Sequence, residues 1–224
     1  GKGSSVGIAS IGNGNIDYTG SITINDKADK AASVGIYKKE GTGIIDTSAG
    51  NWTVGAGGYG IYVQQAKVTK DASGNEISTM TSNSAVINNS ADMTLGMSSV
   101  GIFSNGANTV NNSGDITVGE TFVPGGNHSD VTEHLNSVGI YGAGETKIYN
   151  AAGATIKVHE DHSVGVYVDG TNTRFENHGI IDVDNGGVGV IVRNGAIAVN
   201  EIGGVITLGA NAAACGAVNV GMSA

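Results

Sequence analysis

Two short patterns of alternating apolar and polar residues recur along the chain. The first reads Ser-Val-Gly-Ile-Tyr at residues 33–37 and returns, with small changes, at 99–103, 137–141 and 163–167. Degenerate copies lie at 5–8, 58–62, 187–191 and 219–222. Alternation with a period of two predicts β-strands, because successive side chains of a strand point to opposite faces.

The second pattern has the form Gly-x-Ile-x-Val and lies between copies of the first. Its copies occupy 20–24, 50–54, 91–95, 114–118, 154–158, 179–183 and 204–208. It also predicts strands, and its regular interleaving with the first pattern indicates an internal repeat.

The spacing of the repeat predicts the fold. The central glycines of the first pattern are residues 7, 35, 60, 101, 139, 165, 189 and 221, so the basic unit is about 25 residues. Short strands in such a unit cannot bury their own apolar face, but stacked units can. We therefore expect an all-β chain, a right-handed parallel β-helix of about eight coils that stack about 4.8 Å apart. Residues 1–224 form one domain in this interpretation.

Strand alternation assigns faces to both patterns. In the first, we expect the valine and the isoleucine, such as Val34 and Ile36, to point into the rod, while the glycine and the aromatic residue face out. In the second, Ile116 and Val118 face inward and Thr117 faces outward.

Asparagines recur at one offset before the second pattern, as Asn89, Asn112 and Asn177. Stacked coils would align them into a ladder of side-chain amides at a turn. Asparagine is also an ordinary turn residue, and that explanation stays open.

Two insertions break the period. One runs from about residue 63 to 84, and the other from about 119 to 136 and contains Pro124, the only proline. Insertions in a solenoid loop out on one side, which is often the binding side. The chain begins and ends within a repeat, so we expect it to be a fragment of a longer solenoid.

Composition narrows the classes of function. With 38 glycines but 1 proline, the chain is not collagen, and with 39% hydrophobic and 14% charged residues it is not expected to be disordered. A net charge of −9 disfavours binding to the phosphates of nucleic acids. The single cysteine, Cys215, excludes an internal disulfide. No apolar run approaches the roughly 20 residues that a membrane helix needs.

The tandem units Asn-Ser-Val-Gly-Ile-Tyr and Asn-x-Gly-x-Ile-x-Val resemble the passenger region of autotransporter adhesins of type V secretion, especially those of fusobacteria. The resemblance covers nearly the whole chain. It implies a monomeric β-helical stalk at the cell surface, anchored in a bacterial outer membrane through a barrel that this chain lacks. It also implies attachment to proteins or glycans of host cells or other bacteria. It names no receptor, no cofactor and no catalytic residue.

The aromatic residue of the first pattern suggests a binding surface. Stacked coils would align these residues into an outward ladder that contacts a partner, or that only stiffens the rod. The ladder comprises Tyr37, Tyr62, Phe103, Tyr141 and Tyr167. The second insertion adds candidate contact residues that could also bind an ion, namely His128, Asp130, Glu133 and His134. The cluster His159-Glu160-Asp161-His162 is interpreted as an exposed turn.

Two other functions remain as alternatives. One is a carbohydrate-active β-helix enzyme such as a polysaccharide lyase, which needs carboxylates or a basic residue converging on a groove. The other is a structural spacer with no ligand. A row of threonines suggests ice binding, but Lys157 and Asp182 interrupt it. The row comprises Thr23, Thr53, Thr94, Thr117 and Thr207. The Gly-x-Gly-x-x-Gly at 55–60 leads into a predicted strand, so we interpret it as a turn and not as a dinucleotide site.

Overall fold

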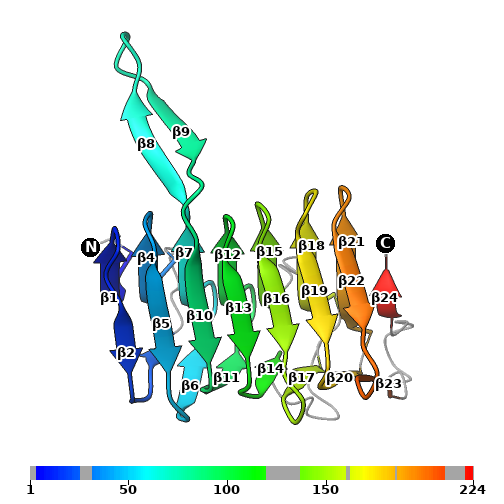
Figure 1. Ribbon diagram of the computed structural model, residues 1–224. Helices are drawn as coiled ribbons and strands as arrows, with labels where there is room; N and C mark the ends of the chain where they lie inside the picture. The colour runs from blue at the N-terminus through cyan, green and yellow to red at the C-terminus, as the bar shows by residue number, and fades with distance from the viewer. Residues whose placement is uncertain are drawn as a thin grey trace.

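The chain forms a rod of stacked coils (Figure 1). The structure, a computed structural model, describes residues 4–25, 32–119, 137–159, 162–184, 186–209 and 220–223. Strands and turns make up this part of the chain, and no helix in it could cross a membrane.

Three parallel sheets run along the rod, and seven successive coils contribute one strand to each sheet, while β24 adds an eighth strand to the first. The first sheet contains the Ser-Val-Gly-Ile-Tyr pattern. Its eight strands are β1 (Val6–Ile11), β4 (Val34–Lys39), β7 (Tyr59–Gln64), β12 (Val100–Asn105), β15 (Val138–Ala143), β18 (Val164–Asp169), β21 (Val188–Arg193) and β24 (Val220–Ser223).

The second and third sheets have seven strands each. The second consists of β2 (Ile16–Tyr18), β5 (Gly43–Thr47), β10 (Ala85–Asn89), β13 (Thr109–Asn112), β16 (Lys147–Asn150), β19 (Arg174–Asn177) and β22 (Ile197–Asn200). The third contains the Gly-x-Ile-x-Val pattern and consists of β3 (Thr23–Ile24), β6 (Asn51–Val54), β11 (Asp92–Leu95), β14 (Ile116–Val118), β17 (Thr155–Val158), β20 (Ile180–Val183) and β23 (Val205–Leu208). This arrangement is a parallel β-helix, and it confirms the predicted fold class.

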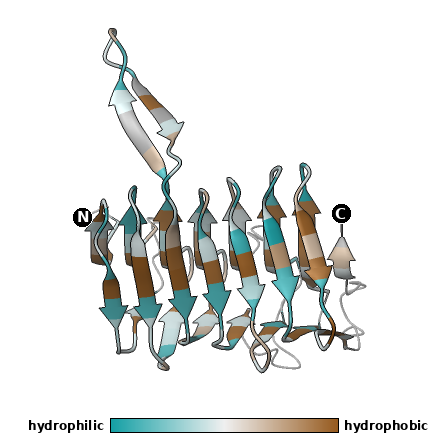
Figure 2. Cartoon of the chain, in the orientation of Figure 1, coloured by the Kyte–Doolittle hydropathy of each residue, from teal (hydrophilic) through white to brown (hydrophobic). Residues whose placement is uncertain are grey.

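The core is a column of branched apolar side chains enclosed by the three sheets. Equivalent residues pair across coils, as Ile61 pairs with Ile102 and Ile102 with Ile140, and all three are fully buried. In the third sheet Ile116 and Val118 are also fully buried, as predicted. Figure 2 shows the apolar residues of the strands in brown and the polar ends and turns in teal.

The valines of the first pattern correct one prediction. Val34, Val100 and Val138 are only half-buried and do not belong to the core. Tyr59 occupies the position of these valines in its own coil, where it pairs with Val34 and Val100. Its ring packs against the outward ring of Phe103. The expectation that these valines line the interior is therefore wrong, because they face outward beside the aromatic residues.

The glycine of the first pattern faces inward instead. A Cβ built on Gly101 would lie 2.6 Å from the main-chain oxygen of Gly139 and 3.4 Å from Cδ1 of Leu95, a core residue. The next residue, Ile102, is also buried, so two successive residues point inward and the strict alternation breaks here. Only a residue without a side chain fits where successive coils approach this closely.

The interior also holds a lysine. Lys38 follows the aromatic residue of β4 and is fully buried, and its Nζ donates to the main-chain oxygens of Gly12 at 2.8 Å and Gly14 at 2.9 Å. Desolvation by burial lowers the pKa of this ammonium group. The lysine thereby ties the turn of the first coil to the second coil.

Buried asparagines form the expected ladder, and the ladder is longer than predicted. Each side-chain Nδ2 donates to Oδ1 of the asparagine in the next coil: Asn89 to Asn112 at 2.8 Å, Asn112 to Asn150 at 3.0 Å, Asn150 to Asn177 at 2.9 Å and Asn177 to Asn200 at 2.8 Å. At the start of the row, Thr47 Oγ1 donates to Asn89 Oδ1 at 2.9 Å. These asparagines end the strands of the second sheet, and four of them are fully buried.

Candidate functional site

The predicted aromatic ladder exists on the outer face of the first sheet. Strand pairing aligns its rungs, and consecutive rings stack with interplanar angles of 3–23°. The centroid distances are 5.7 Å for Tyr37–Tyr62, 4.4 Å for Tyr62–Phe103, 4.9 Å for Phe103–Tyr141 and 5.4 Å for Tyr141–Tyr167.

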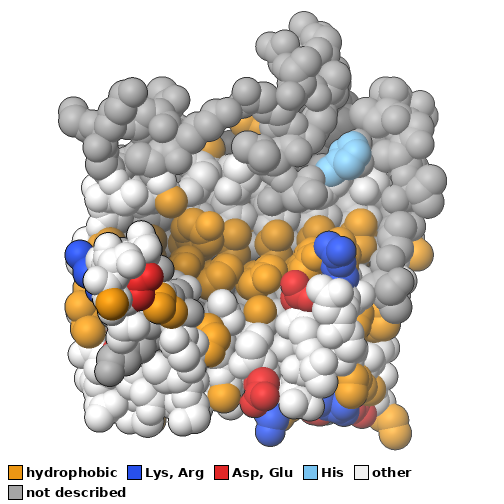
Figure 3. All heavy atoms as spheres, turned by 90° about the horizontal axis from the view of Figure 1, so that it is seen from above, with side chains coloured by type: hydrophobic (Ala, Val, Ile, Leu, Met, Phe, Trp, Pro, Cys, Tyr) orange, Lys and Arg blue, Asp and Glu red, His pale blue; other side chains and the backbone are white. Residues whose placement is uncertain are grey.

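Beside the ladder runs the row of outward valines, with Tyr59 in one position. The ring of Tyr59 stands edge-on to Tyr62 at 5.2 Å and to Phe103 at 6.0 Å. We call these two rows together the apolar strip. Figure 3 shows an orange band of hydrophobic side chains crossing this side of the rod. Sequence reasoning missed Tyr59, because its position in the pattern was assigned to the interior.

The pKa values of two tyrosines in the ladder are raised above the ordinary value for tyrosine. Burial raises the pKa of Tyr62, and the neighbouring Tyr59 and Tyr37 raise it further. Burial likewise raises the pKa of Tyr141, with a contribution from Asp169. The Tyr62 hydroxyl donates to Gln64 Oε1 at 3.1 Å.

Stacking limits what the ladder can bind. Each internal rung has another ring over both faces, so its faces are covered and its edge points outward. At the C-terminal end Tyr167 pairs with Ile191, and Arg193 Nη1 donates to the Tyr167 hydroxyl at 3.0 Å. A ligand that stacks flat on an aromatic ring therefore has no free face on the internal rungs. The strip instead offers ring edges, hydroxyls and methyl groups.

The first insertion folds into a hairpin that projects from the rod (Figure 1). Strands β8 (Ala66–Lys70) and β9 (Glu76–Met80) pair antiparallel and form a two-stranded sheet of their own. At the tip, Asp71 Oδ1 accepts hydrogen bonds from the main-chain N–H groups of Ser73 and Asn75, both at 2.8 Å. The insertion begins after Gln64, slightly later than predicted, because β7 continues past Tyr62.

Gln65 anchors the hairpin to the rod. It is fully buried, and its Nε2 donates to the main-chain oxygen of Gly41 at 2.8 Å and to Asn108 Oδ1 at 3.1 Å. Ala66, the first residue of β8, is 1% exposed, whereas Ile77 and Met80 of β9 are 47% and 45% exposed. The base is thus fixed in the core, and the arm itself lies in solvent.

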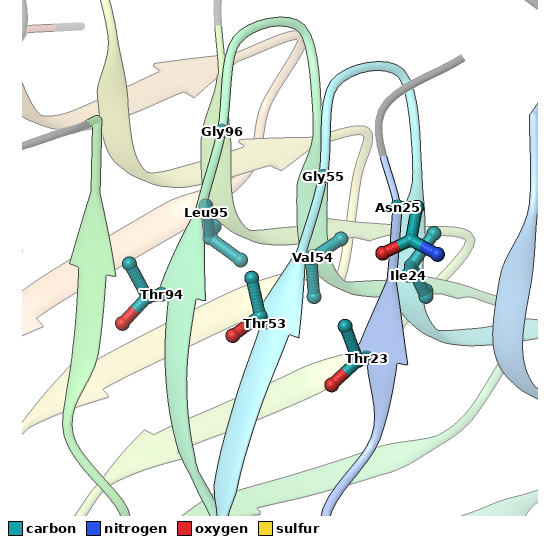
Figure 4. A pocket seen from close by; sticks show the side chains of 9 residues that line it. All are labelled: Thr23, Ile24, Asn25, Thr53, Val54, Gly55, Thr94, Leu95 and Gly96. Carbon is teal, nitrogen blue, oxygen red and sulfur yellow. The ribbon is translucent and has the colours of Figure 1, made fainter.

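A shallow depression lies on the outer face of the third sheet. It holds about 180 Å³, and its lining includes Thr23, Thr53 and Thr94 from successive coils, with Asn25 at one side. Figure 4 shows the three hydroxyls on the same side of the row. The volume is below the roughly 300–1,000 Å³ typical of small-molecule pockets, so the depression does not enclose a ligand.

Several acidic side chains have structural roles. Asp92 Oδ1 accepts the main-chain N–H of Asp115 at 2.8 Å, and Asp115 Oδ1 accepts that of Thr155 at 2.7 Å. Within the described ranges, no group of three or more histidine, cysteine, aspartate or glutamate side chains is placed to hold a metal ion. In the glycine-rich stretch, residues 55–58 form the predicted turn between β6 and β7, with the Gly58 N–H donating to the Gly55 oxygen at 3.0 Å, and residues 59 and 60 begin β7.

The remaining candidate residues lie elsewhere. His128, Asp130, Glu133 and His134 of the second insertion fall outside the described residues. His159 and His162 lie between β17 and β18, and the two residues between them are also outside the described part. The structure therefore brings the aromatic residues together but does not test the second insertion.

Comparisons with known proteins add no relative. No protein-family model matches the chain, and no curated protein and no solved structure is found to be similar to it.

Proposed function

We propose that this chain is a non-catalytic stalk segment of a surface adhesin, displayed at a bacterial outer membrane as an autotransporter passenger. The observation that carries the proposal is the hairpin of residues 66–80, which projects from a rigid, regularly stacked rod. The repeated sequence units support the same class of protein by resemblance.

The rod suits the role of a support. Its coils are joined by continuous parallel pairing, by the buried asparagine ladder and by the aromatic ladder on the outer face of the first sheet. Such layers resist bending, because bending separates side chains that are packed across several coils. A binding element on the rod is then held away from the membrane at a defined height.

Three elements are the proposed contacts with a receptor protein or glycan. These are the projecting hairpin, the apolar strip and the insertion at 119–136. The hairpin exposes apolar side chains at Ile77 and Met80, and the strip exposes ring edges. Exposed apolar groups of this kind mark interaction surfaces more often than ordinary surface does.

A binding screen against arrays of glycans and cell-surface proteins tests the proposal. We expect a receptor that the intact chain binds and that is lost on deletion of 66–80 or of 119–136. The matched control is Asn111→Ala, a change on the outer face of the second sheet that leaves all three elements in place. Absence of any binding by the intact chain contradicts adhesion and favours a spacer, while binding that both deletions retain removes the insertions from the contact.

A further inference from the structure

The hairpin carries two strand edges with no partner among the described strands. The main-chain N–H of Thr81 donates to the oxygen of Gln65 at 2.8 Å, and that of Asp71 donates to the oxygen of Asn75 at 2.9 Å. These two bonds determine which residue pairs of the hairpin are hydrogen-bonded to each other. Because bonded and non-bonded pairs alternate in antiparallel strands, the N–H groups of residues 76, 78 and 80 point away from the hairpin. These groups form an open row of donors and acceptors along β9.

The two edges differ in how well they are protected. Strand β8 reads Ala-Lys-Val-Thr-Lys, and β9 reads Glu-Ile-Ser-Thr-Met. Lysine on an edge strand is a common device against strand pairing, and only β8 carries it. The β9 edge is therefore the one that accepts another strand.

The hairpin also gains from an added strand. A two-stranded sheet is marginally stable in water, and three or more strands with a shared apolar face are needed for independent stability. Ile77 and Met80, which are about half exposed, lie on this strand. Residues 77 and 80 lie on opposite faces of the strand, so pairing along β9 would cover part of one apolar side chain on each face.

We propose that β9 pairs antiparallel with β9 of a second copy of this chain, which joins the two hairpins into one four-stranded sheet. A two-fold axis through residue 78 satisfies the outward N–H groups of both copies, because residue 76 then faces residue 80 of the second copy. In this register Ile77 lies opposite Thr79, and β-branched residues that face each other across strands stabilise sheets. No two like charges face each other, because Glu76 lies opposite Met80.

The interface is small. Two strands of five residues each bury less than the roughly 1,000 Å² expected of a stable solution dimer. Self-association is therefore weak for free chains and becomes strong when many copies share a surface, where effective concentrations reach about millimolar. The pairing itself needs only the hairpin, whereas its strengthening on a surface rests on the proposed display of many copies there.

Disulfide trapping tests the pairing. In the proposed register the two Cα atoms of residue 78 lie about 5.5 Å apart, within the range that a disulfide spans. We would place Ser78→Cys in a chain whose only cysteine is removed by Cys215→Ala. We expect a covalent dimer to form at least about tenfold faster than with Ser73→Cys at the hairpin tip or Lys70→Cys on the β8 edge.

A second variant needs no cysteine. Ser78→Pro removes one outward N–H and no bond within the hairpin, so sedimentation at high concentration should show loss of self-association while the circular dichroism spectrum is unchanged. Ala72→Pro at the tip is the control and should retain self-association. Equal trapping rates at all three cysteines, fastest trapping at residue 70, or undiminished self-association of Ser78→Pro would each overturn the proposal. If the trapping rates at all three cysteines were equal, the partner of the β9 edge would be a strand of a different protein and not a second copy of this chain.

Discussion

The side-chain amide of Asn112 joins two coils in the interior of the rod: its Nδ2 donates to Oδ1 of Asn150, 3.0 Å away. The same nitrogen donates to the main-chain oxygen of Gly114 at 2.9 Å. Asn112 thus closes its own turn and binds the next coil at once. Buried amides with both protons and the oxygen satisfied are costly to disturb.

Replacement of Asn112 by alanine should lower the free energy of unfolding by about 2–4 kcal/mol, because it leaves polar atoms of Asn89 and Asn150 without a buried partner. Urea denaturation followed by circular dichroism measures the loss. Asn111→Ala is the control, since this neighbouring amide is exposed and donates only to Asn88 Oδ1 at 2.8 Å among the described contacts. Equal losses in both variants would mean that the buried ladder contributes no more than surface amides do.

Gly101→Ala should destabilise the rod strongly, because the new Cβ would lie 2.6 Å from the main-chain oxygen of Gly139. The comparison is Gly153→Ala, at a turn where a Cβ meets no atom within 4 Å but φ is +92°. Backbone strain alone costs about 1–2 kcal/mol there. Overpacking costs about 1–3 kcal/mol, and at Gly101 the cost should lie at the upper end, because the new Cβ meets a main-chain oxygen that cannot rotate away. Thermal unfolding should rank Gly101→Ala as the less stable variant, and the reverse order would contradict the inward position of this glycine.

The aromatic ladder can be interrupted at its centre. Phe103→Ala removes two stacked contacts and should cost about 2–3 kcal/mol, since each aromatic pair contributes roughly 0.5–1.5 kcal/mol beyond the burial of its area. Phe103→Tyr is the conservative control: the neighbouring rungs Tyr62 and Tyr141 are tyrosines, so stability should change by less than about 0.5 kcal/mol. A loss as large in Phe103→Tyr as in Phe103→Ala would show that something other than ring stacking sets the cost.

Ionisation of Tyr62 should couple to unfolding at alkaline pH. Its pKa is raised in the folded chain, so the unfolded chain loses this proton first, and stability should fall as pH rises above the ordinary tyrosine pKa of about 10. Absorbance at 295 nm should show tyrosinate forming late in the folded chain, and Tyr62→Phe should remove part of this late phase. The same titration in concentrated urea serves as the reference. An identical late phase in the variant would assign it to other tyrosines.

The sequence was sufficient for the architecture because its repeat is strong. Residues that recur at fixed offsets predict two strands of each coil and the direction in which the coils stack. They also predict the aromatic ladder from Tyr37 to Tyr167. The strands of the second sheet were not predicted. Short segments such as Thr109–Asn112 end in asparagine, which also signals a turn. These asparagines belong to strands, with their amides turned inward.

The repeat pattern did not predict which side chains break the strict alternation between inward and outward. The glycine faces inward and the valine outward because two successive residues, Gly35 and Ile36, are buried in one strand, and residue propensities do not predict this. Lys38 could have been assigned to the interior, because it lies two residues after Ile36 on the same face, but a charged residue argues against burial. The hairpin had a signal too, as 66–70 and 76–80 alternate around a turn with Asp71 and Gly74.

The amides of the asparagine ladder all point one way, since each nitrogen donates to the oxygen of the coil that follows it in the chain. Their dipoles therefore add along the axis instead of cancelling, and each one is polarised by its predecessor. A coil that is already folded offers an aligned donor to the segment that comes next. The same coil offers an aligned acceptor to the segment that precedes it, so a short stack of folded coils can act as a template for growth at both of its ends.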